Sequence, residues 1–150
     1  MAAAVISSAA PAGTVLAFDF GTQRIGVAVG ETGIGVAHPL ATVDARSGRA
    51  RFEAIRALIE EWRPALLVVG LPTHADGTAH AMTARALGFV RQLEGRFGLP
   101  VACCDERFTT YDAELALRGA GVRGRAAKTV RDQVAAQLIL QSYLDQRLAT

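Results

Sequence analysis

The sequence lacks any long hydrophobic run. Its 150 residues contain no apolar stretch near the roughly 20 residues that cross a membrane, and the longest blocks, such as residues 65–69, have the length of a strand. The first 13 residues hold no Lys or Arg, so they lack the basic start of a secretory signal. We therefore expect a cytoplasmic protein with a frayed tail at 1–13 and no membrane partner.

Cysteine is scarce, and histidine shows no ligand spacing. The two cysteines, Cys103 and Cys104, are adjacent. Neighbours on a strand point to opposite faces, so a disulfide between them would be strained. We expect two buried free thiols. His38, His74 and His80 are too scattered for a zinc site, and we expect them on the surface or in loops.

Lysine is almost absent, and one segment lacks acids. Fifteen of the 16 basic residues are arginine, and the formal net charge of +2 points to no partner. Residues 118–131, however, hold five basic side chains and no acid, namely Arg118, Arg123, Arg125, Lys128 and Arg131. Such a segment can hold a polyanion through phosphate contacts, or it can be an ordinary solvated loop.

Length and composition predict one globular domain over residues 14–150. Hydrophobic residues make up 51% and charged residues 20% of the chain, which is a globular composition. Bilobal ATPases and protein kinases need a longer chain. Residues 19–22 also fit the first phosphate-binding motif of the actin-like ATPases. Those enzymes need two such domains, and 150 residues are too few for both, so we set this class aside.

The hydrophobic pattern alternates between strand and helix periods. Apolar strand-like runs cover 15–20, 24–30, 34–43 (interrupted by Pro39), 65–69 and 99–104. Helical spacing marks a segment ending before Pro64, a second over 79–97, a short one from Thr109 or Thr110 to about Arg118, and a long one over about 126–148. This order predicts an α/β fold with a five-stranded mixed sheet, three antiparallel strands followed by alternating helices and strands, flanked by helices.

Three acidic positions interrupt apolar elements. Asp19 lies in the run VLAFDF, Asp105 and Glu106 follow the apolar residues 101–104, and Asp132 lies on the stripe of the last helix that includes Ala136, Ile139 and Tyr143. An ionised carboxylate in such a setting is costly unless it is paired, hydrogen-bonded or bound to metal.

Each acid also has an ordinary structural interpretation. Asp19 can bond the turn at Gly21, Glu106 can pair with Arg107 at a polar strand end, and Asp132 can favour a helix start through the helix dipole. On a regular strand Asp105 and Glu106 face opposite ways, so one of the two would share a face with the other acids.

Taken together, the acids predict a metal site. One sheet can bring all three element ends together, and clustered carboxylates repel unless cations neutralise them. Hard oxygen ligands select Mg²⁺ or Mn²⁺. Such a cluster suits two-metal hydrolysis of a phosphodiester.

Four motifs in this order resemble the YqgF/RuvX family, over about residues 15–147. They are DFGT with RIGVA at 19–28, VVGLP with DGT at 68–78, DERFTT at 105–110, and Lys128 with DQVAA at 132–136 continuing to ILQSYLD at 139–145. The resemblance implies an RNase H-like fold and a nuclease similar to the Holliday-junction resolvase RuvC, acting on the 5′ end of pre-16S rRNA.

The resemblance also implies site residues. Asp19, Glu106 and Asp132 would be catalytic and hold the metal, with Asp105 as the alternative ligand to Glu106. Resolvases of the RuvC type carry an acid on the strand at 65–69, where this chain has Gly70, so the third ligand would come from the next strand. Arg24 would hold a phosphate or pair with Asp19, and Arg131 would contact phosphate or face solvent. The remaining nucleic-acid contacts would be Gly70, Asp76, Gly77, Arg107, Arg123, Arg125 and Lys128.

The sequence leaves the substrate open between structured RNA, with ribosomal particles as a further partner, and branched DNA. A homodimer would favour the junction because it presents two sites at a fixed spacing, whereas a monomer would not. A non-catalytic RNA-binding assembly factor is a third hypothesis, which binding of Mg²⁺ or Mn²⁺ would separate from the enzymes.

Overall fold

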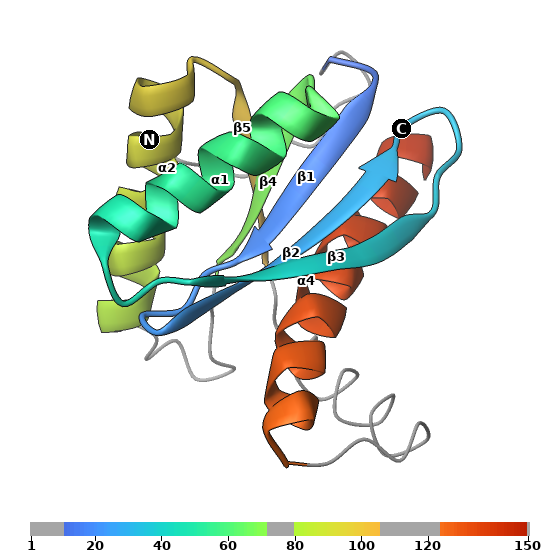
Figure 1. Ribbon diagram of the computed structural model, residues 1–150. Coiled ribbons are helices and arrows are strands. Elements are labelled where there is room, and N and C mark those ends of the chain that lie inside the picture. Colours follow the sequence, from blue (N-terminus) through green and yellow to red (C-terminus); the bar gives the residue numbers. More distant parts are fainter. Residues whose placement is uncertain (1–10, 72–79, 106–123, 150) are drawn as a thin grey trace.

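The computed structural model describes residues 11–71, 80–105 and 124–149 (Figure 1). Its elements, in chain order, are β1 (Thr14–Asp19), β2 (Arg24–Glu31), β3 (Ala37–Asp44), α1 (Gly48–Trp62), β4 (Leu66–Leu71), α2 (His80–Phe97), β5 (Val101–Asp105) and α4 (Gly124–Ala149). The short helix expected from Thr109 or Thr110 lies outside the described residues, as does most of the expected tail.

The five strands form one mixed sheet in the order β3-β2-β1-β4-β5. β2 pairs antiparallel with both β1 and β3, whereas β4 is parallel to β1 and β5 is parallel to β4. The predicted sheet, with three antiparallel strands followed by parallel ones, is confirmed. β1 lies at its centre, so the end of β1 is flanked by a strand on each side.

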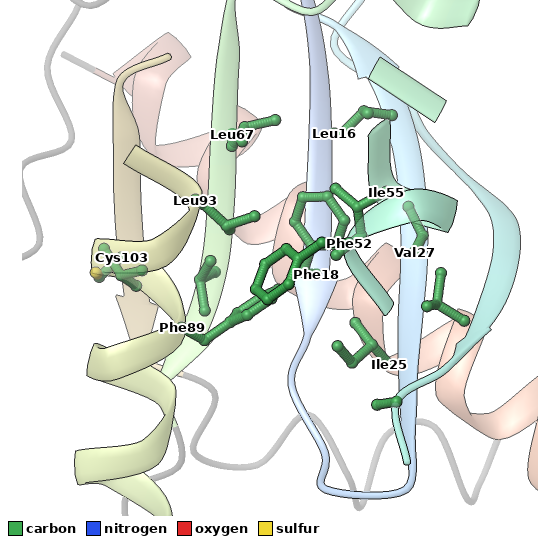
Figure 2. Packing of buried hydrophobic residues seen from close by; sticks show 14 of the residues in the cluster. Leu16, Phe18, Ile25, Val27, Phe52, Ile55, Leu67, Phe89, Leu93 and Cys103 are labelled. Carbon is green, nitrogen blue, oxygen red and sulfur yellow. The ribbon is translucent and has the colours of Figure 1, made fainter. Parts of the chain in front are cut away.

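Helices cover both faces of the sheet, as Figure 1 shows. On one face, α1 and α2 pack on a core of alternating strand residues that includes Leu16, Phe18, Leu67 and Cys103 (Figure 2). Phe89 of α2 lies at its centre; its ring centroid is 5.9 Å from that of Phe18, 5.0 Å from that of Phe20 and 6.1 Å from that of Phe52.

The long helix α4 covers the opposite face. It packs on the other set of alternating residues, namely Val15, Ala17, Ala28, Leu66, Val68, Ala102 and Cys104. The two cysteines are therefore buried, outside any disulfide and on opposite faces, as predicted. Burial raises the pKa of the Cys103 thiol, and Glu94 adds to the shift.

Two local features shape β3 and the end of α1. Pro39 lies inside β3, opposite Ala28, and the register shifts there so that Val27 pairs with Ala41. A proline is tolerated because β3 is an edge strand with a bulge. Helix α1 ends at Trp62 because Arg63 adopts a left-handed conformation with φ of 46°, one residue before Pro64.

Helix α4 approaches the sheet most closely at Gly26 of β2. A Cβ atom on Gly26 would lie 1.8 Å from the carbonyl oxygen of Asp132, which no structure allows. The absence of a side chain at this position therefore lets the helix backbone lie directly against the strand. Ala135 and Ala136 are also buried beneath the helix, so the predicted small-residue stripe is confirmed.

This contact predicts the effect of a methyl group. Gly26→Ala should lower the free energy of unfolding by about 1–3 kcal/mol, since α4 has to shift away from the sheet to admit the new Cβ. Urea denaturation measures this. In the matched control Gly33→Ala, the new Cβ meets nothing within 4 Å, and the change should stay within about 0.5 kcal/mol. Equal stability of the two variants would contradict the close approach.

Candidate active site

Asp19 is the last residue of β1, at the carboxyl end of the central strand. It is partly exposed rather than enclosed in the apolar run, because the strand ends here, one residue earlier than its pattern suggests. Val15 and Ala17 face α4, so Asp19 is on the same face by alternation. Its partners in the neighbouring strands are Gly26 and Gly70. Both strand neighbours of this carboxylate therefore lack a side chain.

Asp132 reaches the same place from α4. Its backbone lies against Gly26, and Gly26 is the register partner of Asp19. The two acids are thus neighbours across one glycine, although 113 residues separate them in the sequence. The side chain of Asp132 is 20% exposed. The structure brings these two predicted carboxylates to one edge of the sheet, on one face.

Arg24 neutralises Asp132. Its Nε donates a hydrogen bond to Oδ2 of Asp132 at 2.7 Å, and the arginine side chain is 40% exposed. Arg24 is the first residue of β2, two positions before Gly26, so it lies on the same face of the sheet. The sequence analysis expected Arg24 to hold a phosphate or to pair with Asp19. The ion pair in the structure joins Arg24 to Asp132 instead, because α4 brings Asp132 to the start of β2.

The third carboxylate of the prediction is not placed. Asp105 ends β5 in register with Leu71 of β4. Glu106, Arg107, Asp76, Gly77 and Arg123 lie outside the described residues, and of Arg125 and Lys128 only the backbone, in the first turns of α4, is described. Within the described ranges, no group of three His, Cys, Asp or Glu residues forms a metal site.

Arg131 does not simply face solvent. The residue is partly buried, and its Nε is a buried donor without a hydrogen-bond partner in the described part of the chain. A buried donor of this kind normally finds an acceptor. The phosphate contact expected of Arg131 stays a prediction.

Sequence reasoning missed the glutamines that position α4. Gln133, Gln137 and Gln141 recur every fourth residue and bond the edge strand β3 and the turn before it. Gln133 donates to Oγ1 of Thr42 at 3.2 Å, and Gln137 donates to the carbonyl of Ala37 at 3.1 Å. Gln141 bonds both the carbonyl of Gly35 and the amide of Ala37. The i,i+4 spacing of these glutamines was the signal that the sequence offered for a polar contact along one side of the helix. Their hydrogen bonds fix the position of α4, and hence of Asp132, along β3.

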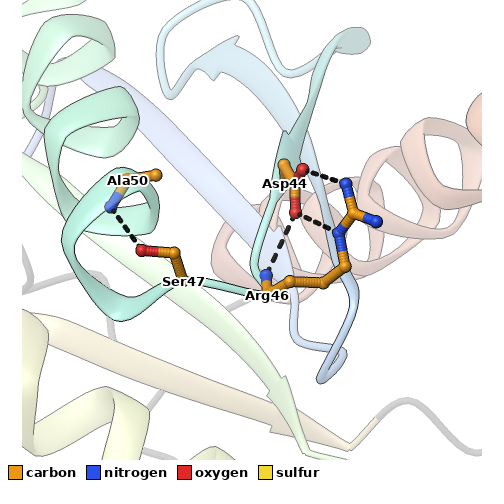
Figure 3. A network of polar contacts seen from close by, with 4 residues as sticks. All are labelled: Asp44, Arg46, Ser47 and Ala50. Atoms are coloured by element: carbon orange, nitrogen blue, oxygen red, sulfur yellow. Dashed lines mark hydrogen bonds and ion pairs between the residues drawn. The ribbon is translucent and has the colours of Figure 1, made fainter.

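A polar depression of about 380 Å³ lies beside Arg24, the partner of Asp132. It is lined by Gln23, Arg24, Thr42, Asp44, Arg46 and Thr129. Arg46 bonds both carboxylate oxygens of Asp44, at 3.0 and 2.7 Å, and its backbone amide adds a third bond at 3.1 Å (Figure 3). These hydrogen bonds lower the pKa of Asp44 from 3.8 to about 2. Asp44, the one acid among the described residues that line the depression, is thereby held ionised and paired.

This pairing predicts a titration. The Asp44 carboxyl should titrate near pH 2 in NMR spectra of the folded protein, and near 3.8 in Arg46→Gln. Because the folded pKa is lowered, the contribution of Asp44 to stability is complete above about pH 4 and is lost as the pH falls toward 2. In the control Arg49→Gln, whose partner is Glu53, Asp44 should titrate as in the wild type. An unchanged Asp44 pKa in Arg46→Gln would contradict the assignment.

A mixed sheet of this strand order, with a carboxylate at the end of its central strand and its last helix packed across one face, defines the RNase H-like class of proteins. The chain belongs to the RuvX family, because the family model described as "RuvX: Holliday junction resolvase" matches residues 13–146. The resemblance drawn from the four motifs is thereby confirmed.

The similarity to known proteins extends over nearly the whole chain. This chain is 55% identical over 139 residues to the "Putative pre-16S rRNA nuclease" of Nitrosospira multiformis, covering 93% of this chain and 92% of the relative. It is 57% identical over 133 residues to the protein of the same name in Dechloromonas aromatica, covering 89% and 91%. RuvC of T. thermophilus, solved with a Holliday junction substrate, has the same fold, with a TM-score of 0.53, 20% identity and coverage of 92% and 97%.

None of the helices in the described ranges is long and apolar enough to span a membrane.

Proposed function

We propose that this protein is a metal-dependent nuclease that hydrolyses phosphodiester bonds of structured RNA, in processing the 5′ end of pre-16S rRNA during ribosome biogenesis. The observation that carries the proposal is the meeting of Asp19 and Asp132 across Gly26. The names of the relatives at 55% and 57% identity support the RNA substrate.

The donor set fits a divalent cation. Two carboxylates on one face, in partly exposed positions, offer the hard oxygen ligands that Mg²⁺ and Mn²⁺ prefer. For the third ligand we favour Glu106 over Asp105. Ala102 and Cys104 lie on the face of α4, and position 106 is next in that alternating series. Asp105 belongs to the other series and remains the alternative.

In this proposal the acidic residues bind the metal and the basic residues bind the nucleic acid. Asp19, Asp132 and Glu106 hold the metal, and the basic residues Arg123, Arg125, Lys128 and Arg131 hold the phosphate backbone of the nucleic acid. Gly70, Asp76, Gly77 and Arg107 complete the proposed contacts. When bound, divalent ions stabilise the charge that develops on the attacking and leaving oxygens of a phosphodiester.

Branched DNA is the second candidate substrate. The family model is described as a Holliday junction resolvase, and the fold matches RuvC. Both substrates present the same scissile bond, so the carboxylates do not separate them. A comparison of a precursor RNA with a four-way DNA junction, at equal protein and Mn²⁺ concentrations, decides between them.

The metal centre predicts a loss of activity without a loss of fold. Asp19→Asn should cleave a labelled RNA spanning the precursor 5′ end, with Mn²⁺, at below about 1% of the wild-type rate. Mutation of a residue that only supports a metal ligand lowers metal affinity or activity by about 10- to 100-fold. Asp19 would be a direct ligand, so its loss should cost at least as much. Glu106→Gln and Asp132→Asn should behave alike. The control Asp145→Asn removes an exposed acid farther along α4 and should keep full activity.

The outcomes have different meanings. Full activity of Asp19→Asn would contradict the proposed site. No cleavage by the wild type, together with no binding of Mn²⁺, would favour the non-catalytic RNA-binding assembly factor.

The basic segment predicts a change in salt dependence. The double variant Arg123→Ala with Arg125→Ala should bind RNA more weakly, and the slope of log K against log salt should fall in magnitude by about 1–2, since each lost phosphate contact removes about 0.7–0.9. Fluorescence anisotropy across a salt series measures this. The control pair Arg49→Ala with Arg91→Ala changes exposed arginines of α1 and α2 and should leave the slope unaltered. An unchanged slope in the first variant would remove the segment from the interface.

A further inference from the structure

We propose that Arg24 is a resident counter-cation of Asp132, which a divalent ion displaces, and that the released guanidinium then binds a phosphate in the adjoining depression. The inference rests on the proposed function, since it supposes that Asp132 ligates metal. It adds a coupling between two ligands, in which metal and nucleic acid each favour the binding of the other.

The ion pair between Arg24 and Asp132 is a single, partly exposed hydrogen bond, which another cation can replace. Nε of Arg24 lies 2.7 Å from Oδ2 of Asp132, and among the described residues this is the guanidinium's one hydrogen bond to a carboxylate. A bidentate fork would hold both oxygens. Here the other oxygen, Oδ1, makes no hydrogen bond to the described residues, and the two side chains are 40% and 20% exposed. Water and ions therefore reach the pair.

A divalent ion and the guanidinium compete for this carboxylate. Asp19 lies next to Asp132 across Gly26, so an ion between the two acids would stand a few ångströms from a fixed positive charge. Like charges at that range repel. Without metal, Arg24 relieves the repulsion between the acids; with metal, the same charge becomes unfavourable. Binding of the ion therefore weakens the contact of Arg24 with Asp132.

The depression receives the displaced arginine. Arg24 lines it together with Gln23, Thr42, Arg46 and Thr129. Arg24 and Gln23 offer hydrogen-bond donors there, whereas the Thr42 hydroxyl already donates to the carbonyl of Thr129. Asp44, the acid among the described lining residues, is already paired with Arg46 on both of its oxygens. With Arg24 turned from Asp132 toward this space, the lining carries a net positive charge. The planar guanidinium fork matches a phosphate group.

The coupling is reciprocal by thermodynamic necessity. If metal releases Arg24 for phosphate, phosphate on Arg24 also frees Asp132 for metal. The protein would then bind metal weakly on its own and more tightly with nucleic acid in place.

Titration with Mn²⁺ alone tests the first half. Free Mn²⁺ is followed by electron paramagnetic resonance, using the full chain of the wild type and of Arg24→Gln. The variant should bind Mn²⁺ about three- to fivefold more tightly, the factor expected for removing a partly exposed ion pair. Arg24→Lys keeps the charge and should stay within about twofold of the wild type. Arg49→Gln, which removes the same charge from a distant exposed pair, should match the wild type.

The second half is measured on the wild type, and the variants serve only to assign the signal. The ¹H–¹⁵N signal of the Arg24 side-chain Nε–H, assigned by its loss in Arg24→Gln or Arg24→Lys, should be protected from exchange without metal. Saturating Mg²⁺ should remove the protection. Inorganic phosphate should then shift this signal when Mg²⁺ is present and leave it unchanged when Mg²⁺ is absent.

Each failure has a distinct meaning. If the wild type and Arg24→Gln bind Mn²⁺ equally, or the variant binds more weakly, the inference is wrong while the proposed nuclease stands. An Nε–H signal that ignores Mg²⁺ likewise overturns the inference. If neither protein binds Mn²⁺, the proposed metal dependence fails and the inference falls with it.

Discussion

The contact between α4 and β2 at Gly26 is the constraint on which the rest of the site depends. A helix backbone lies against a strand at van der Waals range only where the strand has no side chain, and Gly26 provides that gap directly under Asp132. Because Gly26 is also the register partner of Asp19, one close approach brings together two acids from opposite ends of the chain. The glutamine row on α4 fixes the helix at this height by bonding β3 and the turn before it.

The two faces of the sheet serve different purposes. The face toward α1 and α2 is filled by aromatic and aliphatic side chains around Phe89 and forms the larger core. The face toward α4 is lined near its centre by small residues such as Ala17 and Ala28, so the helix lies close and its polar residues reach the strand ends. Strand alternation assigns each residue to one face, which explains why the adjacent cysteines are both buried in different cores.

Charge compensation is the second theme of the site. Two carboxylates at one sheet edge repel, and in the described protein Arg24 balances one of them at 2.7 Å. Asp44 and Arg46 form a separate pair at the rim of the same depression. Two arginines, Arg24 and Arg46, therefore pair with acids at this depression. Their remaining donors give it the positive potential that attracts an anion such as a phosphodiester.

Local pattern determined much of this protein in advance. The alternation of apolar runs predicted the order of strands and helices, the position of Asp19 at a strand end, and the stripe of Asp132, Ala136 and Tyr143 on one helix, because period and composition are local properties. Tertiary structure alone decided the rest. The pairing of Arg24 with Asp132 joins residues 108 positions apart, the bulge beside Pro39 depends on strand register, and the role of Gly26 exists only because α4 crosses there. Such contacts arise from how elements meet, and no window of sequence contains both partners.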